Sequence, residues 1–563
     1  MNDQRQPPNI QMTIFWPENL EKKCPVCGSR VMFAYKSNPR NVITLEGVIV
    51  EQVNYYKCSN PDCELHKQAF NPSPTISYSQ RRYGVDVLRY IADEFLLFNQ
   101  KVDAIYDRIH KEYSIEISES TIRRICEDVL IVKAEMIDKR TLEMVKRNGK
   151  VLLALDGQDP GMSGLSIWMF TDCITNRVLA TVKAGSMDHR KLNQIVSEIL
   201  QKYEVELMGV VSDKQGMIVK WHDTYYPDVP HQYCQFHFLQ NLWSHLNLYD
   251  NRVFMGLKKV IKGLYIMHPD KDDRAYVEGM GYVELKTIFK EMVDDLSMML
   301  KVRTKKFKLL RGLWLYEKLE EYVKGLNDAL ADLDDSSRIT KLLIKTYNKL
   351  REGLSLYSEG YLNTLLLFEE FGKVRGILGD PNTSKSEKER LLKEEFEWLY
   401  ELGSSTGLAT PPSELRSFLA RSNSSFQQIL GEWYRLYSSY SGGLLNYYEF
   451  KVDDPSKWRT NTGQEHAFSL QKQMLYDRSA KKDVSSGIVS YGELFLRLIH
   501  SERSELESDI VNEYHEVEIK HLREALQRNK SIISGRWRLR NKDYLGYLKI
   551  ITEYILSNEK NKI

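Results

Sequence analysis

The 563-residue sequence predicts a multidomain protein with an α/β core whose elements follow the order βββαβαβα. Four short apolar runs have the length and the bounding turn residues of buried strands, at residues 151–155, 165–170, 177–183 and 207–213. Residues 186–203 carry apolar side chains at three- and four-residue spacing, which indicates a helix. Residues 243–457 read almost entirely as helix, so a large all-α insertion interrupts the core.

Two strands of the predicted core stop on an aspartate. The first apolar run gives way to Asp156 and Gly157, and the fourth run ends on Asp213. The helix between them can be capped by Ser186 or Asp188. A second helix is expected around residues 217–224, and residues 230–238 predict a fifth strand that leads into a helix. Because both aspartates end short buried strands, we expect them at the sheet edge where open α/β sheets bind ligands.

This order, with acids closing the first and fourth strands, resembles the RNase H fold of DDE transposases, retroviral integrases and related nucleases. The string Cys234-Gln-Phe-His237 is similar to the C-x-x-H motif of Mutator-like transposases and their bacterial insertion-sequence relatives. The Arg-Thr-Asn-x-x-x-Glu string from Arg459 to Glu465 is similar to the third-acid motif of that group and of hAT elements, which also carry a long helical insertion. The resemblance therefore implies an RNase H-like core.

The resemblance also implies a DNA transposase that uses two-metal phosphoryl transfer. Asp156, Asp213 and Glu465 would be catalytic and would hold two Mg²⁺ or Mn²⁺ ions, because hard oxygen ligands suit those metals. Double-stranded DNA, as transposon ends and target, would be the partner of a homodimer or higher oligomer. Four residues would support the active site, namely Cys234, His237, Arg459 and Asn461.

Each of these residues has an alternative interpretation. Asp156 and Asp213 could be turn residues, and Thr462 to Glu465 matches a capping box. Three other acids could take a place in the triad, namely Asp159, Asp172 and Glu493. Cys234 and His237 could bind a second zinc with His231. The chain could also be a domesticated, non-catalytic DNA-binding regulator or another RNase H-like nuclease.

Four cysteines near the N-terminus form two knuckle-like pairs. Cys24 and Cys27 form a C-x-x-C motif with two residues between them. Cys58 and Cys63 enclose a wider gap of four residues. The residues between the pairs alternate as in strands, so the sequence predicts a zinc ribbon with these four thiolates as ligands of a structural Zn²⁺. His66 is an alternative to Cys63.

Two basic segments are predicted to contact DNA. Residues 101–130 read as a helix-turn-helix whose second helix is capped by Ser118 or Ser120. A plain helical hairpin is the alternative. The cluster around Trp537 mixes cations with an aromatic ring and could hold a DNA backbone. The DNA-binding residues predicted in these two segments are Ser120, Thr121, Arg123, Arg124, Arg536, Arg538 and Arg540.

Composition places limits on the class of protein. With 42% hydrophobic and 28% charged residues and a net charge of +2, DNA binding must depend on local basic patches. No apolar window is long enough for a membrane span and residues 1–11 do not resemble a signal peptide, so we expect a cytoplasmic, nucleoid-associated protein in a prokaryote or a nuclear one in a eukaryote. The predicted segments are 1–75, zinc ribbon; 76–138, helix-turn-helix; 139–242, first part of the core; 243–457, insertion; 458–490, catalytic helix; and 491–563, basic helical region.

Overall fold

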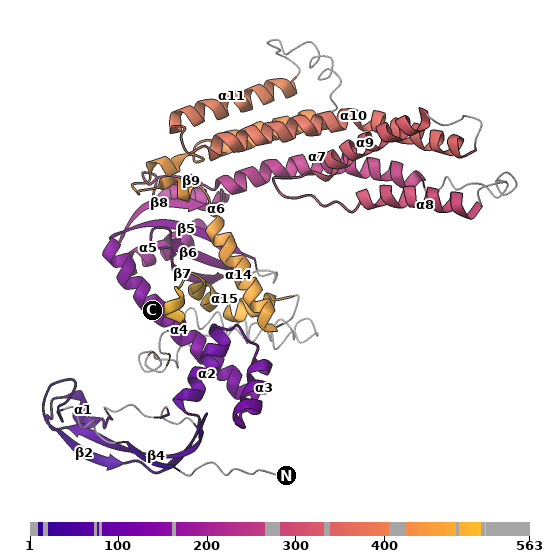
Figure 1. Cartoon of the computed structure of the whole chain (residues 1–563). Coiled ribbons are helices and arrows are strands. Elements are labelled where there is room, and N and C mark those ends of the chain that lie inside the picture. Colours follow the sequence, from indigo (N-terminus) through magenta and orange to yellow (C-terminus); the bar gives the residue numbers. More distant parts are fainter. Residues whose placement is uncertain are drawn as a thin grey trace, which may run out of the picture. The chain divides into compact units, whose positions relative to one another are not determined.

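The structure is a computed structural model that describes residues 10–14, 21–71, 76–77, 82–159, 165–264, 282–331, 338–404, 424–479 and 483–507, together with residues 510 and 513. The chain divides into two compact units (Figure 1). Unit one comprises Met1–Met208 and Thr462–Ile563, and unit two comprises Gly209–Asn461. The helical insertion therefore belongs to a unit that begins within the core sheet.

The described strands are β1 Ile10–Ile14, β2 Val31–Lys36, β3 Arg40–Thr44, β4 Gly47–Cys58, β5 Lys150–Gln158, β6 Ser166–Asp172, β7 Arg177–Ala184, β8 Glu206–Ser212 and β9 His231–Tyr233. The described α-helices are α1 Glu64–Lys67, α2 Val85–Leu96, α3 Val102–Tyr113, α4 Glu119–Asn148, α5 His189–Tyr203, α6 Gly216–Tyr225, α7 Gln235–Leu264, α8 Tyr282–Met299, α9 Arg311–Ala331, α10 Arg338–Gly379, α11 Lys385–Ser404, α13 Ser424–Tyr440, α14 Thr462–Ser479, α15 Ser485–Ile499 and α16 Arg503–Glu507. Two short 3₁₀ helices, η2 Asn446–Glu449 and η3 Pro455–Trp458, precede α14.

The N-terminal sheet is built around the long strand β4. Strand β1 pairs with β4 in parallel, and β2 and β3 pair with it in antiparallel directions. Strand β4 ends on Cys58, which lies opposite Val31 at the start of β2. The alternation read from the sequence is therefore confirmed as a strand pattern.

The second sheet has the strand order β7-β6-β5-β8-β9. Strands β5, β6 and β7 form an antiparallel meander, whereas β8 and β9 are parallel. Both sheets are therefore mixed, and the predicted order βββαβαβα is confirmed from β5 to α7. Helix α5 begins after Asp188, whose Oδ1 accepts hydrogen bonds from the N–H groups of Arg190 and Lys191 at 2.9 and 2.8 Å. Asp188 rather than Ser186 is thus the cap.

The expectation that Asp156 ends the first core strand is wrong. Strand β5 continues to Gln158, and Asp156 pairs with Met169 of β6. Gly157 allows this because the Trp168 indole packs against it, and an added Cβ would lie 2.9 Å from a Trp168 ring carbon. The sequence pattern Asp-Gly indicated a turn, but packing of the tryptophan keeps the chain extended.

Helix α4 is longer than predicted and includes the expected basic connector at residues 139–149. Its buried apolar residues continue from Ile122 to Val145, and it ends only where Gly149 adopts a positive φ of 70°. Before α4, Ser114 ends α3 in the left-handed region, and the Ser118 hydroxyl caps α4 by accepting from Thr121 N–H at 3.2 Å. The predicted helix, break and helix are present, and Ser118 is the cap.

Unit two is dominated by long helices. Helices α7, α9 and α10 pack side by side (Figure 1) around a core that includes Phe254, Leu257, Leu315 and Leu350. Helix α7 runs without interruption from Gln235 to Leu264, so the last helix of the core and the first helix of the insertion are one element. None of the helices in the described ranges is apolar over a length that would cross a bilayer.

Two carboxyl groups approach each other between α10 and α11. Burial and a hydrogen bond with Glu370 raise the pKa of Glu395 from its ordinary value of 4.5 to about 8. A raised pKa in the folded state means that this group's contribution to stability is full below 4.5 and is lost as pH rises through about 8.

We expect Glu395→Gln to remove that pH dependence. Between the two pKa values the wild-type protein should lose about 1 kcal/mol of local stability, after allowance for partial exposure. Amide hydrogen exchange of α11 at several pH values measures the loss. Glu394→Gln, which changes a solvent-facing neighbour paired with Arg390, is the control and should behave as wild type. An unchanged pH dependence in Glu395→Gln would contradict the assignment.

Candidate functional site

The four predicted zinc ligands meet at one point. The Sγ atoms of Cys24 and Cys63 are 3.7 Å apart, those of Cys27 and Cys58 are 3.4 Å apart, and all four ligand atoms lie within 4.8 Å of one another. Sulfur atoms bound tetrahedrally to zinc at about 2.3 Å would be separated by about 3.8 Å. The donor set and spacing therefore fit a Zn²⁺ ion.

The contacts of Cys63 and His66 favour Cys63 as the fourth ligand. Cys63 belongs to the cluster, whereas His66 Nδ1 lies 2.9 Å from the backbone oxygen of Cys58. Hydrogen bonds from Ser29 lower the pKa of Cys27 to about 6, while burial raises the pKa of Cys58 to about 12. A metal would replace the proton that the Cys58 thiol keeps at neutral pH.

Within the described residues, no other group of three or more Cys, His, Asp and Glu side chains is as closely gathered as the cysteines. The predicted triad is therefore not held at the spacing of a single-ion site. Ligands of two ions that are about 3.5 to 4 Å apart are spread more widely than those of one ion. Asp156 and Glu465 belong to unit one and Asp213 belongs to unit two.

In unit one, Asp156 and the helix of Glu465 share one face of the sheet. Asp156 lies opposite Met169, so the two side chains are on the same face. Met169 packs in a core with Ala467 and Phe468 of α14, and α14 contacts β5. Glu465 is in the first turn of α14 and is half-buried. The fold thus brings two acids that are far apart in sequence to the same side of the meander.

Two glutamines that the sequence did not single out lie beside these acids. Gln158, two residues beyond Asp156 on the same face, is 6% exposed, and Gln464 is 3% exposed. The amide N and O atoms of both side chains are enclosed and have no hydrogen-bond partner in the described structure. Buried amides normally find partners, so these sites call for water or a hydrated ion. Mg²⁺ retains several waters when bound, and a hydrated ion would suit this environment.

The alternative acids have other roles or surroundings. Asp172 is fully buried and accepts hydrogen bonds from the N–H groups of Leu152, Ile174 and Thr175, so it fixes the β6–β7 turn. Burial raises its pKa. Glu493 forms an ion pair with Lys183 at 3.3 Å. Asp159 is exposed just beyond β5.

In unit two, Cys234 joins the two motifs that the resemblance connects. Its N–H donates to the backbone oxygen of Ser212 at 2.8 Å, next to Asp213. Its Sγ accepts from the N–H of Asn461 at 3.1 Å, and the N–H of Gln235 donates to the Arg459 oxygen at 3.0 Å. Ser212, which precedes Asp213, and the residues before α14 are therefore neighbours of one buried cysteine, although more than two hundred residues separate them in sequence.

The interpretation of Cys234, His237 and His231 as a second zinc site is not supported. These three residues do not form a metal-binding group in the part of the chain that the structure describes. His231 Nε2 lies 2.8 Å from the Ser212 hydroxyl, and burial lowers the pKa of His231 to about 3. A neutral His231 beside Ser212 supports the end of β8, and Cys234 acts as a hydrogen-bonding tie.

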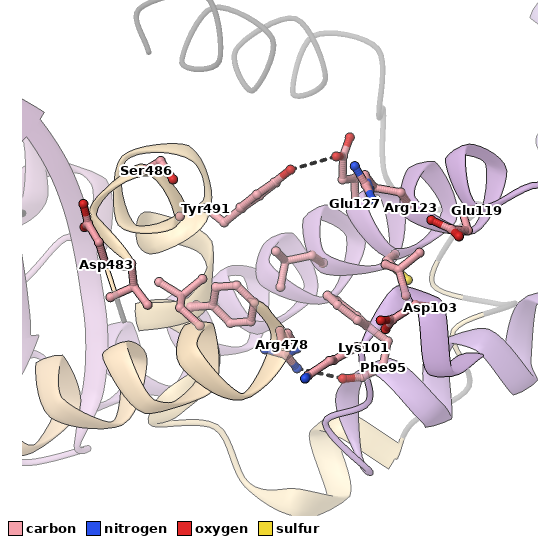
Figure 2. Close-up of a pocket in the computed structure, with 17 residues that line it drawn as sticks. Phe95, Lys101, Asp103, Glu119, Arg123, Glu127, Arg478, Asp483, Ser486 and Tyr491 are labelled. Atoms are coloured by element: carbon pink, nitrogen blue, oxygen red, sulfur yellow. Dashed lines mark hydrogen bonds between the residues drawn. The ribbon is translucent and has the colours of Figure 1, made fainter. Parts of the chain in front are cut away.

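The predicted recognition helix borders a cavity of about 620 Å³ between α2 to α4 and α14 to α15, shown in Figure 2. Arg123 lines this cavity, whereas Arg124 is exposed and Ser120 and Thr121 hydrogen-bond with Ser118. Across the cavity the Tyr491 hydroxyl donates to Glu127 at 2.8 Å (Figure 2). The cluster of Arg536, Arg538 and Arg540 lies outside the described residues.

No protein-family model and no curated protein matches this chain.

Proposed function

We propose that the chain is a DNA transposase that cuts transposon ends and joins the freed 3′-hydroxyl to target DNA. Asp156, Asp213 and Glu465 form its active site, and the RNase H-like fold of the core is part of the proposal. Two-metal phosphoryl transfer requires ligands such as these carboxylates to hold two ions about 3.5 to 4 Å apart.

The contacts of Cys234 are the observation that carries this proposal. Cys234 is bonded on one side to the residue that precedes Asp213 and on the other side to Asn461. Helix α14 begins at the next residue, and Glu465 lies in its first turn. Covalent continuity thus limits how far Glu465 can lie from Asp213. Within unit one, Asp156 shares its sheet face with α14.

Each of these residues would have a separate role in the reaction. Bound Mg²⁺ or Mn²⁺ would activate the attacking hydroxyl and stabilise the leaving oxygen. The three carboxylates would hold the ions and fix their separation. Gln158 and Gln464 would orient water through their enclosed amides. Cys234 would hold Asn461, the residue before α14, through its hydrogen bond.

The N-terminal modules supply the DNA-binding part of the proposal. A zinc ribbon and a helical pair with a capped second helix would hold end-containing duplex, with Ser120, Thr121, Arg123 and Arg124 nearest the DNA. Two ends must be joined, so a homodimer or higher oligomer is the expected active form.

Comparison of Glu465→Gln with Glu465→Ala tests the role of Glu465, the proposed acid that is most distant in sequence from the other two. If Glu465 is a ligand, both variants should lose metal-dependent cleavage of end-containing DNA, because neither side chain can bind Mg²⁺ as a carboxylate. If Glu465 only caps the helix, the glutamine variant should cleave normally.

Glu493→Gln is the matched control for this experiment. It removes a carboxylate on the neighbouring helix α15 that is paired with Lys183 of strand β7. Normal cleavage by Glu493→Gln together with inactive Glu465 variants supports the proposal. Loss of cleavage in Glu493→Gln alone would transfer the role of third acid to Glu493.

A further inference from the structure

One face of the paired strands β2 and β4 exposes aromatic and basic side chains together. Five residues form this face, which we name the platform: Arg30, Met32, Tyr35, Tyr55 and Lys57. Met32 is 50% exposed and Tyr35 is 49% exposed, and both cations are exposed. Neighbouring large side chains that are about half exposed, such as Met32 and Tyr35, place apolar surface in water. Such a patch often marks a binding surface.

A β-bulge creates the platform. Met32 pairs with Lys57 and Tyr35 pairs with Tyr55, and the register shifts between Phe33 and Tyr35. Without the extra residue, Met32 and Tyr35 would point to opposite sides of the sheet, because side chains alternate along a strand. Tyr35 and Tyr55 stack with ring centroids 5.0 Å apart and an interplanar angle of 17°. The bulge therefore presents a preformed aromatic stack beside Met32.

The charge of the platform is positive. Arg30 continues the β2 edge toward Lys57, and neither cation forms a salt bridge in the described structure. Two acids of this region are paired with other cations, since Glu51 is buried with Arg40 and Glu21 pairs with Lys23. An aromatic stack beside two such cations is complementary to a polyanion that carries flat rings.

We propose that the platform binds unpaired nucleobases of single-stranded DNA, with the outer face of Tyr35 stacking on a base and with Arg30 and Lys57 contacting phosphates. Stacking requires a base that is free of its duplex neighbours, so the platform should prefer single strands to duplex. This site does not depend on the proposed catalytic carboxylates. It gives the ribbon a function besides duplex recognition.

The test uses the full-length zinc-loaded chain and a fluorescein-labelled oligothymidine of about 12 nucleotides. Fluorescence anisotropy should show that Tyr35→Ala weakens single-strand binding roughly 10-fold or more. Binding of a hairpin duplex of the same length should be unchanged. The double variant Arg30→Gln with Lys57→Gln should reduce the slope of log K against log salt by about 1.4 for the single strand.

Matched controls come from the opposite face of the same strand. Phe33→Ala removes an aromatic ring that is 60% exposed, and Lys36→Gln removes an exposed cation. Both should bind oligothymidine as wild type, and zinc content must be equal in all variants. Asp156→Asn should also bind oligothymidine normally, which separates this proposal from the catalytic one.

Three results would overturn the proposal. Unchanged single-strand affinity in Tyr35→Ala would exclude stacking on the platform. Equal losses for single strand and duplex would make the face a duplex backbone contact. A change in sedimentation of Tyr35→Ala without loss of DNA binding would make the face a contact between copies of the chain.

Discussion

Asp156→Asn and Asp213→Asn are each expected to lower metal-dependent cleavage of end-containing DNA by more than about 100-fold, because each removes a charged ligand of the catalytic ions. Asparagine keeps the size of the side chain, so the fold of β5 and the end of β8 should persist. Binding of the same DNA should be unchanged, since the ribbon and α4 do not involve these residues. A gel assay of strand nicking with Mg²⁺ and with Mn²⁺ measures the effect.

Asp159→Asn is the control for both variants. It changes an exposed acid just beyond β5 and should cleave as wild type. Retained cleavage in Asp156→Asn or Asp213→Asn would refute the catalytic assignment. Loss of DNA binding together with cleavage would indicate a folding defect and would be checked by circular dichroism. A wild-type chain that binds ends specifically but never cuts them would favour the domesticated regulator.

Cys58→Ser is expected to unfold the ribbon within the full-length chain. Cys58 is fully buried at the end of β4, and structural zinc sites contribute about 10 to 16 kcal/mol of apparent binding free energy. The purified wild-type chain should contain about one zinc. Limited proteolysis should cut the variant within residues 21–71, and a strong chelator should produce the same cuts in the wild type.

His66→Ala is the matched control for the zinc site. His66 follows Cys63 closely and contacts the Cys58 backbone, but it lies outside the cysteine cluster. It should retain zinc and resist proteolysis. A folded, protease-resistant Cys58→Ser chain would contradict a structural zinc, and loss of zinc in His66→Ala would change the ligand set.

The strands and helices of the core could be predicted because their signals are local. Apolar runs and helical spacing gave β5 to α7 in the right order, and Ser118 and Asp188 were among the predicted caps. Asp156 was misplaced at a strand end because Asp-Gly usually marks a turn. The deciding contact, Trp168 on Gly157, is made by a different strand and has no local signature.

The candidate site was predictable only in part. The cysteine spacing identified all four members of the cluster, since tetrahedral metal sites constrain spacing along the chain. Gln158 and Gln464 were missed because a glutamine in an amphipathic pattern reads as a surface residue. Their significance lies in burial without partners, which depends on tertiary packing. The tie from Cys234 to Asn461 was likewise invisible, although both residues had been associated with the site by resemblance.

Iron-mapped cleavage of the polypeptide tests the convergence of the three acids most directly. Fe²⁺ would replace Mg²⁺ in the full-length chain, and ascorbate with peroxide would generate radicals that cut the backbone close to the bound ion. We predict cuts around residues 156, 213 and 465, all suppressed by excess Mg²⁺ and all lost together in Asp156→Asn. Cuts near residues 156 and 213 without any near 465 would contradict a site built from these three carboxylates.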